Sequence, residues 1–148
     1  MTLILNRLEV EEFSSFRLDN TRINLAIDCA IKEGDEIYLY DWKTGKSLSE
    51  DLSIQLCCYA PYAMGKWNAS SESLRIIEYN LSFDKSNWFS ITQGEVEDIK
   101  GYIKGSIKDM ESLWVDLGNN IPVEEEGFSK LEDDRVSLRC NFRKVCKG

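Results

Sequence analysis

The 148-residue chain contains no histidine. This absence excludes Ser-His-Asp and Cys-His nucleophile systems, histidine zinc sites and a histidine general base. Any catalysis by this chain must therefore use carboxylates, lysine, tyrosine, cysteine or a metal ion.

Proline and long apolar runs are also scarce. The chain has only two prolines, with 43% hydrophobic and 30% charged residues, which is typical of a folded protein rather than a disordered or collagen-like one. No apolar run approaches the roughly 18 residues of a membrane span, and residues 1–7 are too short for a secretory signal. The sequence therefore predicts a cytoplasmic protein without a membrane partner. Because domains commonly have about 100 to 150 residues, it also predicts a single domain over residues 1–148.

Positive charge is in deficit. The 18 Lys and Arg residues against 26 Asp and Glu residues give a net charge of −8, which by itself disfavours a nucleic-acid partner. The charge is uneven, because residues 93–126 carry nine acids and three lysines, whereas residues 128–148 carry six bases and three acids. The balance weakens a nucleic-acid-binding hypothesis without excluding it.

Hydrophobic periodicity predicts an α/β chain. Alternation over residues 22–31 and an aromatic, branched run over residues 37–42 predict a hairpin with its turn at residues 32–36. Pro61 is expected to bend or end the helix that contains it. The other expected elements are a strand or bent hairpin over residues 3–18, a helix over residues 50–66 capped by Ser49, strands over residues 74–83 and 88–92, a long amphipathic helix from Glu95 to Leu117, a solvated acidic loop at residues 124–126, and a short helix over residues 138–145.

The predicted hairpin places two aspartates opposite each other. If Gly34 and Asp35 form the centre of the turn, cross-strand partners have residue numbers that sum to 69, so Asp28 faces Asp41. Directly opposed β-carbons lie about 4.5 to 5.5 Å apart, and two carboxylates at about 5 Å repel by roughly 3 kcal/mol at an effective dielectric near 20. A divalent cation such as Mg2+ or Mn2+ converts this repulsion into a binding site, because it prefers hard oxygen ligands.

Lys43 lies two residues beyond Asp41 and therefore projects from the same face of the strand. Its ammonium can hold an attacking water or stabilise a transition state, so these side chains are the minimum set for metal-dependent phosphodiester hydrolysis. Gln55 and Tyr59, four residues apart, share a helix face that can orient Lys43 or contact a phosphate. From geometry alone the alternative stays open that Lys43 only neutralises two acids at an exposed hairpin edge. For Gln55 and Tyr59 the open alternative is ordinary helix capping of a polar core.

Three segments of the sequence form a specific signature. They are Ile27-Asp28, Tyr40-Asp41-Trp42-Lys43-Thr44-Gly45 and Gln55-Leu56-Cys57-Cys58-Tyr59-Ala60. Together they resemble the PD-(D/E)XK nucleases of the RecB type, which include helicase-associated exonucleases and CRISPR-associated nucleases. The resemblance implies a restriction-endonuclease-like mixed central sheet flanked by helices and metal-dependent hydrolysis of DNA. It also implies roles for individual residues: Mg2+ or Mn2+ on Asp28, Asp41 and the backbone carbonyl of Trp42, catalysis by Lys43, and support from Gln55 and Tyr59.

The sequence departs from that family before the first strand. Relatives usually carry a helical segment there, with a His or Glu that completes the metal site, and this segment is missing here. Glu9, Glu11 and Glu12 are the candidate substitutes. Either the chain is a truncated form, or its activity depends on a partner.

The cysteines show a second departure. Five is an odd number in a chain without an export signal, so free thiols or metal ligands are expected rather than a disulfide framework. Many relatives bind a 4Fe-4S cluster through an early Cys and a C-x2-C-x5-C run. Here the tail over residues 128–148 keeps only Cys140 and Cys146 of that run, with Ser137 at the remaining position. Because a cluster normally needs four thiolates, none is expected.

The leading hypothesis is therefore a metal-dependent deoxyribonuclease acting on DNA with single-stranded character. Trp42 or Trp67 is available to stack on an unpaired base, with core packing as the competing explanation for both. One alternative is a catalytically incomplete nucleic-acid-binding or scaffolding module with the same fold. Another is an oligomer, or a complex with a protein partner, that covers the region of the missing helix. The basic residues expected to track the DNA backbone are Lys46, Lys66, Arg139, Arg143 and Lys144.

Overall fold

The computed structural model describes residues 6–45 and 52–128. The chain divides into two compact units, residues 1–105 and residues 106–148. Ser49 and the helix expected over residues 138–145 lie outside the described residues. Among the helices that are described, none is long and apolar enough to cross a membrane.

The first unit contains a five-stranded mixed sheet with the strand order β1-β2-β3-β4-β5. β3 and β4 run parallel, and the other neighbouring strands run antiparallel. This arrangement confirms the expected α/β class with a mixed sheet flanked by helices, and it is compatible with a restriction-endonuclease-like fold. The strands are β1 (Asn6–Leu18), β2 (Thr21–Glu33), β3 (Glu36–Lys43), β4 (Leu74–Asn80) and β5 (Lys85–Phe89).

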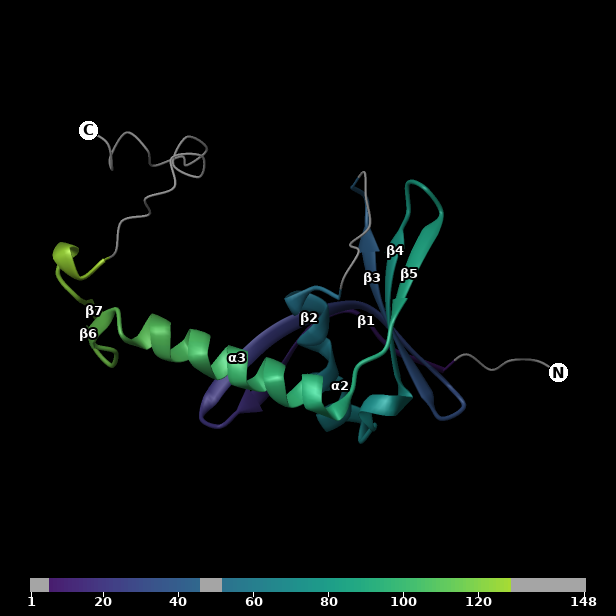
Figure 1. Cartoon of the computed structure of the whole chain (residues 1–148), viewed down its shortest axis with the longest axis horizontal. Helices are drawn as coiled ribbons and strands as arrows, with labels where there is room; N and C mark the ends of the chain where they lie inside the picture. Colours follow the sequence, from purple (N-terminus) through teal and green to yellow (C-terminus); the bar gives the residue numbers. More distant parts are fainter. Residues whose placement is uncertain (1–5, 46–51, 129–148) are drawn as a thin grey trace. The chain divides into compact units, whose positions relative to one another are not determined.

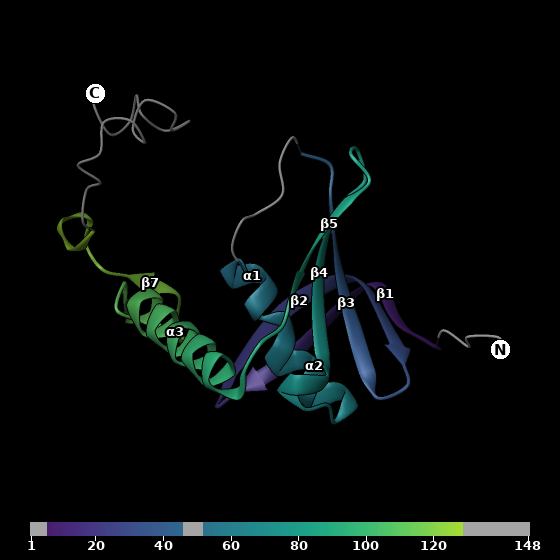
Figure 2. The same ribbon diagram turned by 45° about the vertical axis from the view of Figure 1, so that its right-hand side comes forward.

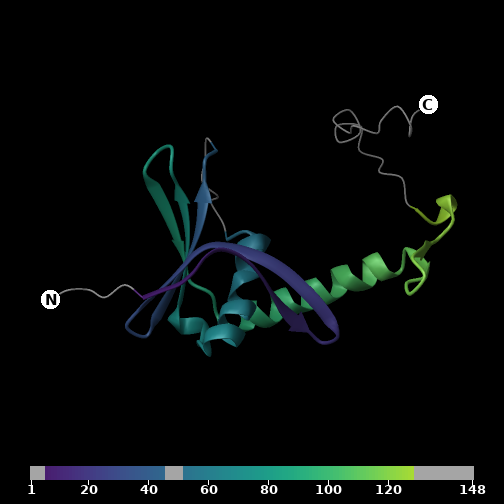
Figure 3. The same ribbon diagram turned by 180° about the vertical axis from the view of Figure 1, so that it is seen from behind.

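Helices α1 (Ile54–Cys57) and α2 (Tyr59–Trp67) connect the two parallel strands, with the 3-10 turn η1 (Ser71–Ser73) before β4. Figures 1, 2 and 3 show both helices on one face of the sheet, with α2 beneath the long curved ribbon of β1 and β2. The core lies between that face and the helices. Its members include the fully buried Ile27, Leu39, Leu56, Ala60 and Ile76.

The helix expected over residues 50–66 is interrupted. Ser53 caps α1, because its side chain accepts a 3.3 Å hydrogen bond from an amide of the first turn. Cys58 separates α1 from α2. Pro61 lies in the first turn of α2, where an amide has no partner within that helix, and its ring nitrogen cannot bond to the carbonyl of Cys57. The interruption predicted from Pro61 is therefore confirmed, whereas the cap is Ser53 rather than Ser49.

The long amphipathic helix is shorter than predicted. α3 (Gln93–Glu111) begins after a capping box, in which Thr92 and Glu95 exchange side-chain and backbone hydrogen bonds. It ends before Leu113 and Leu117, although both continue its apolar spacing. The chain turns back there, because the Leu113 carbonyl accepts a 2.9 Å hydrogen bond from the Val123 amide. β6 (Trp114–Asp116) and β7 (Ile121–Pro122) form the resulting hairpin, followed by the exposed 3-10 turn η2 (Glu125–Gly127) in the acidic segment.

Candidate active site

The hairpin of β2 and β3 has the register that the sequence predicts. Cross-strand partners from Glu33↔Glu36 to Cys29↔Tyr40 have numbers that sum to 69. Gly34 supports the turn with a φ of +59°, a left-handed conformation that glycine adopts without steric cost. Beyond Cys29 the backbone pairing ends, so the predicted cross-strand pair of Asp28 and Asp41 is not formed. The Asp28 side chain instead accepts a 2.6 Å hydrogen bond from the Trp42 amide.

β2 is irregular at Asp28. Ala30 and Ile27 are both fully buried in the core, although residues three apart lie on opposite faces of a regular strand. On β1, Val10 pairs with Cys29 and Glu12 pairs with Ile27, and Glu11 between them has a φ of +47°, which is uncommon for a residue with a side chain. The side of β2 that faces the core therefore changes at Asp28. The Asp28 carboxylate lies next to β3 at this point, where it bonds to the amide of Trp42, the residue after Asp41.

Asp41 is the centre of that site. It follows Ile37 and Leu39 on the core-facing side of β3 and is only 3% exposed. Its Oδ2 pairs with the Lys43 ammonium at 2.6 Å, and its Oδ1 accepts a 3.3 Å hydrogen bond from the Tyr59 hydroxyl. The structure thus brings together the acid, the lysine and the tyrosine that the signature contains.

Tyr59 connects α2 to Asp41. Burial raises the pKa of Tyr59 to about 12; the Gln55 hydrogen bond opposes this rise, and the charges of Asp41 and Asp28 add to it. Tyr59 therefore keeps its proton at neutral pH and acts as a hydrogen-bond donor. Gln55 donates to the Tyr59 hydroxyl at 3.3 Å, as expected for residues that share a helix face, but Gln55 is exposed whereas Tyr59 is buried.

Lys43 is an ammonium at neutral pH. Its hydrogen bond to Asp41 raises the pKa of Lys43, burial opposes this, and the charges of Asp41, Glu78 and Asp28 raise it further. The Lys43 side chain is 33% exposed, so it extends from the buried Asp41 carboxylate to the solvent. Because it carries its proton, Lys43 is suited to stabilising negative charge rather than to removing a proton from water.

Glu78 is a site residue that the sequence reasoning missed. It lies on β4 in register with Asp41 and is only 1% exposed. The sequence pattern that could have identified Glu78 is the alternation of β3 and β4. On the core-facing side, both strands change from apolar to polar residues at the same register position. Along the core-facing side, Ile37, Leu39, Asp41 and Lys43 on β3 are the register partners of Leu74, Ile76, Glu78 and Asn80 on β4.

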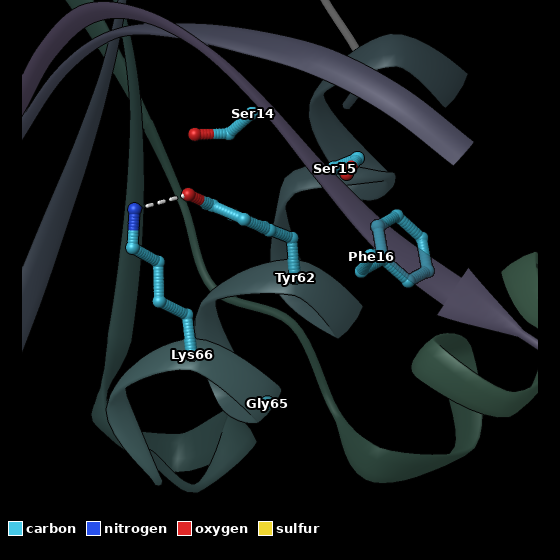
Figure 4. Close-up of a pocket in the computed structure, with 6 residues that line it drawn as sticks. All are labelled: Ser14, Ser15, Phe16, Tyr62, Gly65 and Lys66. Carbon is cyan, nitrogen blue, oxygen red and sulfur yellow. Dashed lines mark hydrogen bonds between the residues drawn. The ribbon is translucent and has the colours of Figure 1, made fainter. Parts of the chain in front are cut away.

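Glu9 belongs to a different cluster. It is only 2% exposed, and its Oε2 accepts a 2.6 Å hydrogen bond from the Tyr62 hydroxyl and pairs with the Lys66 ammonium at 2.5 Å. Its Oε1 accepts a 2.9 Å hydrogen bond from Ser14. Figure 4 shows the Tyr62 and Lys66 side chains joined by their hydrogen bond, with the Ser14 hydroxyl nearby. A cavity of about 390 Å3 adjoins them, lined by Ser14, Ser15, Phe16, Tyr62, Gly65 and Lys66.

The structure therefore changes two expectations. Glu9 does not join the Asp41 site, and Glu11 and Glu12 are exposed on β1. Lys66, expected among the residues that track a DNA backbone, donates hydrogen bonds to Glu9 and Tyr62. Burial works to lower the pKa of Lys66, but those two partners outweigh it and the pKa is raised.

The two tryptophans differ in their surroundings. Trp67 packs edge-on against Tyr62 at 5.7 Å between ring centroids and lies partly buried against the core, which supports the packing explanation. Trp42 projects from the face of β3 opposite to Asp41. There it stacks on Tyr40 at 5.2 Å and meets Tyr79 edge-on at 5.8 Å.

The donor types around Asp41 fit a hard divalent cation, because carboxylate oxygens are its preferred protein ligands. Within residues 6–45 and 52–128, no group of three or more Cys, Asp or Glu side chains is placed so that it could hold a metal ion. The Lys43 ammonium lies at Asp41 Oδ2, so a cation at that oxygen would have to displace it. Cys29, Cys57 and Cys58 are free thiols. The predictions that concern Ser137, Cys140, Cys146, Lys46, Arg139, Arg143 and Lys144 fall outside the described residues.

Comparisons with known proteins give no family. No protein-family model matches the chain, and no curated protein matches it. Among solved structures, the chain is similar to "Crystal structure of SSO0001", with 13% sequence identity, a TM-score of 0.46 and coverage of 93% of this chain. The chain spans 58% of the length of that structure.

Proposed function

We propose that this chain is a metal-dependent nuclease domain that hydrolyses phosphodiester bonds in DNA. The observation that carries the proposal is the buried Asp41, which holds the Lys43 ammonium and the Tyr59 hydroxyl. Asp28 accepts a hydrogen bond from the Trp42 amide, and the charges of Glu78 and Asp28 act on Lys43 together with that of Asp41. Carboxylate oxygens of this kind are the protein ligands that a divalent cation prefers.

Each of the site residues has a role in the proposed reaction. Asp28, Asp41 and the Trp42 carbonyl would hold Mg2+ or Mn2+. When bound, such a cation supplies positive charge against the phosphate oxygens and lowers the pKa of water. Lys43 places its ammonium where negative charge develops on the phosphate. Tyr59 keeps its proton and orients Asp41 through the hydrogen bond to Oδ1.

The substrate class rests on the motif resemblance. The Asp-Trp-Lys-Thr-Gly run and the Gln-x-x-x-Tyr spacing resemble those of RecB-type nucleases, which act on DNA. We propose DNA with single-stranded character on that ground. The net charge of −8 acts against it, and the basic residues that offset this charge are concentrated in residues 128–148.

A cleavage assay tests the proposal. Labelled single-stranded and duplex DNA are incubated with the protein in Mn2+, in Mg2+ and in EDTA. We expect products with either cation and none in EDTA. Asp41→Asn should abolish them, because it removes the central carboxylate while preserving its shape, whereas the exposed Asp98→Asn should not. Products in EDTA, or equal cleavage by Asp41→Asn, would contradict a metal-dependent mechanism at this site.

A catalytically incomplete nucleic-acid-binding or scaffolding module is the second candidate. The 2.6 Å ion pair between Lys43 and Asp41 favours it, because the ammonium lies at an oxygen that the nuclease needs for its cation. This alternative predicts that labelled DNA shows a rise in fluorescence anisotropy with the protein, while Mn2+ yields no products.

A further inference from the structure

We propose that Asn80 is a positioning residue: its buried side chain fixes the backbone at the end of β3 and thereby holds Lys43 in place for the proposed cleavage. The inference rests on the nuclease function proposed above. It assigns a role to a residue outside the three motif segments, at the end of β4.

The turn that follows β4 holds the end of β3. Lys43 and Asn80 are the last register partners of these two parallel strands. From this point three successive carbonyls accept hydrogen bonds from Asn80 and the turn after it. The Lys43 carbonyl accepts from the Leu81 amide at 2.9 Å, the Thr44 carbonyl from the Ser82 hydroxyl at 3.3 Å, and the Gly45 carbonyl from the Asn80 side chain at 2.9 Å.

The Asn80 side chain makes the better protected of the two side-chain bonds. Asn80 is only 1% exposed, whereas Ser82 is exposed and its bond to Thr44 is longer. A hydrogen bond from a buried donor competes less with water than one from an exposed hydroxyl. Asn80 is therefore the main side-chain link between the turn and the segment that continues from Lys43.

The orientation of the Asn80 side-chain amide is fixed by its partners. Its Oδ1 accepts hydrogen bonds from the backbone amides of Ser82 at 2.9 Å and Phe83 at 3.1 Å. Backbone N–H groups only donate and backbone carbonyls only accept, so Nδ2 must face the Gly45 carbonyl. Asparagine thus shapes its own turn with one end of the amide and joins that turn to β3 with the other.

This link acts on Lys43 through the backbone. The Lys43 ammonium pairs with Asp41 at 2.6 Å, yet Lys43 is the last residue of β3 and is followed by the exposed Thr44 and Gly45. Chain ends and exposed loops are the first parts of a fold to open locally. A displacement of about 1 Å in a catalytic group can lower a rate by about 10^2-fold. Anchoring the Gly45 carbonyl therefore preserves the position from which the Lys43 ammonium acts.

Two variants separate the link to β3 from the support of the turn. Asn80→Ala removes both. Asn80→Ser keeps an uncharged oxygen that can accept from the amides of its own turn, but its side chain is too short to reach the Gly45 carbonyl. The matched control is Asn24→Ser, the same change at an exposed position of β2.

Amide hydrogen exchange followed by NMR tests the link independently of activity. The Leu81 amide reports on its bond to the Lys43 carbonyl, and the Val96 amide, which donates to Thr92 at 3.1 Å, reports on the rest of the first unit. We expect both Asn80 variants to accelerate exchange at Leu81 at least about tenfold more than at Val96. Asn24→Ser should change neither.

Initial rates on labelled DNA with Mn2+ test the consequence for catalysis. Asn80→Ser should lower kcat by about 10- to 100-fold and leave KM within about twofold, because a displaced ammonium loses an interaction made in the transition state. In the Lys43→Ala background the same change should alter kcat by less than about twofold, because no ammonium remains to be positioned. Asn24→Ser should cleave like the unmodified chain.

The outcomes separate the two proposals. If the unmodified chain cleaves no DNA, the proposed function fails and the catalytic role of Asn80 fails with it. If the chain cleaves DNA and Asn80→Ser matches it in exchange and in kcat, Asn80 at most shapes its turn and the positioning role alone is overturned. An equal loss of kcat with and without Lys43 overturns that role as well.

Circular-dichroism melting curves establish that each variant is folded at the assay temperature. Should Asn80→Ala unfold, Asn80→Ser alone decides both measurements, because it keeps an acceptor for the amides of the turn.

Discussion

Helix α2 contacts two buried carboxylates, and the two clusters have similar parts. At one level Tyr59 donates to Asp41, and one turn later Tyr62 donates to Glu9. Each carboxylate also pairs with a lysine, at 2.6 Å in the Asp41 cluster and 2.5 Å in the Glu9 cluster.

The clusters differ in how far the acid is satisfied. Glu9 accepts from Ser14, Tyr62 and Lys66 at 2.5 to 2.9 Å, and one carboxylate matches one ammonium. Asp41 has a longer 3.3 Å contact with its tyrosine, and its lysine also feels the charges of Glu78 and Asp28. A buried acid with short hydrogen bonds to several donors holds a fold together, whereas an acid with fewer and longer hydrogen bonds is better suited to exchanging a partner for a cation. Residue type alone would not have separated the two.

The largest expected difference between the clusters is in activity. Lys43→Ala should lower DNA cleavage by about 10^2- to 10^4-fold, because it removes the charge proposed to face the phosphate. Lys66→Met, the matched change in the Glu9 cluster, should leave cleavage within about twofold at a temperature where both variants are folded. Initial rates on labelled DNA measure both. Cleavage at the normal rate by Lys43→Ala would remove this residue from the mechanism.

A change in the Glu9 cluster should reduce the stability of the protein more than the loss of a surface ion pair. Lys66→Met should reduce the free energy of unfolding by about 3 kcal/mol, because it leaves the Glu9 carboxylate buried without its counter-charge. The comparison is Lys100→Met, which breaks the surface ion pair with Glu97 and should cost no more than about 0.5 kcal/mol. Urea unfolding curves measure both values. Equal small losses would show that the Glu9 pair contributes no more than a surface pair.

The smallest expected effect is a change in acid sensitivity. Burial works to raise the pKa of Glu9, but hydrogen bonds from Lys66, Tyr62 and Ser14 outweigh it and the pKa lies below its ordinary value of 4.5. The stability that Glu9 contributes is therefore complete above about pH 4.5 and is lost as the pH falls through the lowered pKa of the folded state. Glu9→Gln should be less stable at neutral pH but lose less stability on acidification, measured by urea unfolding between about pH 3 and 7. Parallel pH curves for the two proteins would refute this account.

The Asp41 site shows how much local patterns can predict. Alternation and the turn centre predicted the register of the β2–β3 hairpin as far as Cys29 and Tyr40, but not that the pairing ends before Asp28, whose carboxylate bonds to the Trp42 amide. The four-residue spacing of Gln55 and Tyr59 predicted that they share a helix face, and they are joined by a hydrogen bond. These relations depend on residues close in the chain, whose geometry follows from the periods of strand and helix.

The sequence by itself therefore determined the α/β class, the central hairpin and which charged side chains of one strand or helix share a face, but not the β6–β7 hairpin after α3. Only the tertiary structure decided which charges meet across the fold. Glu9 and Lys66 are 57 residues apart, and Glu78 reaches Asp41 only because β4 pairs in parallel with β3 after the α1–α2 connection. Such pairings depend on how whole elements pack to bury their apolar faces, and no local period in the sequence encodes that choice.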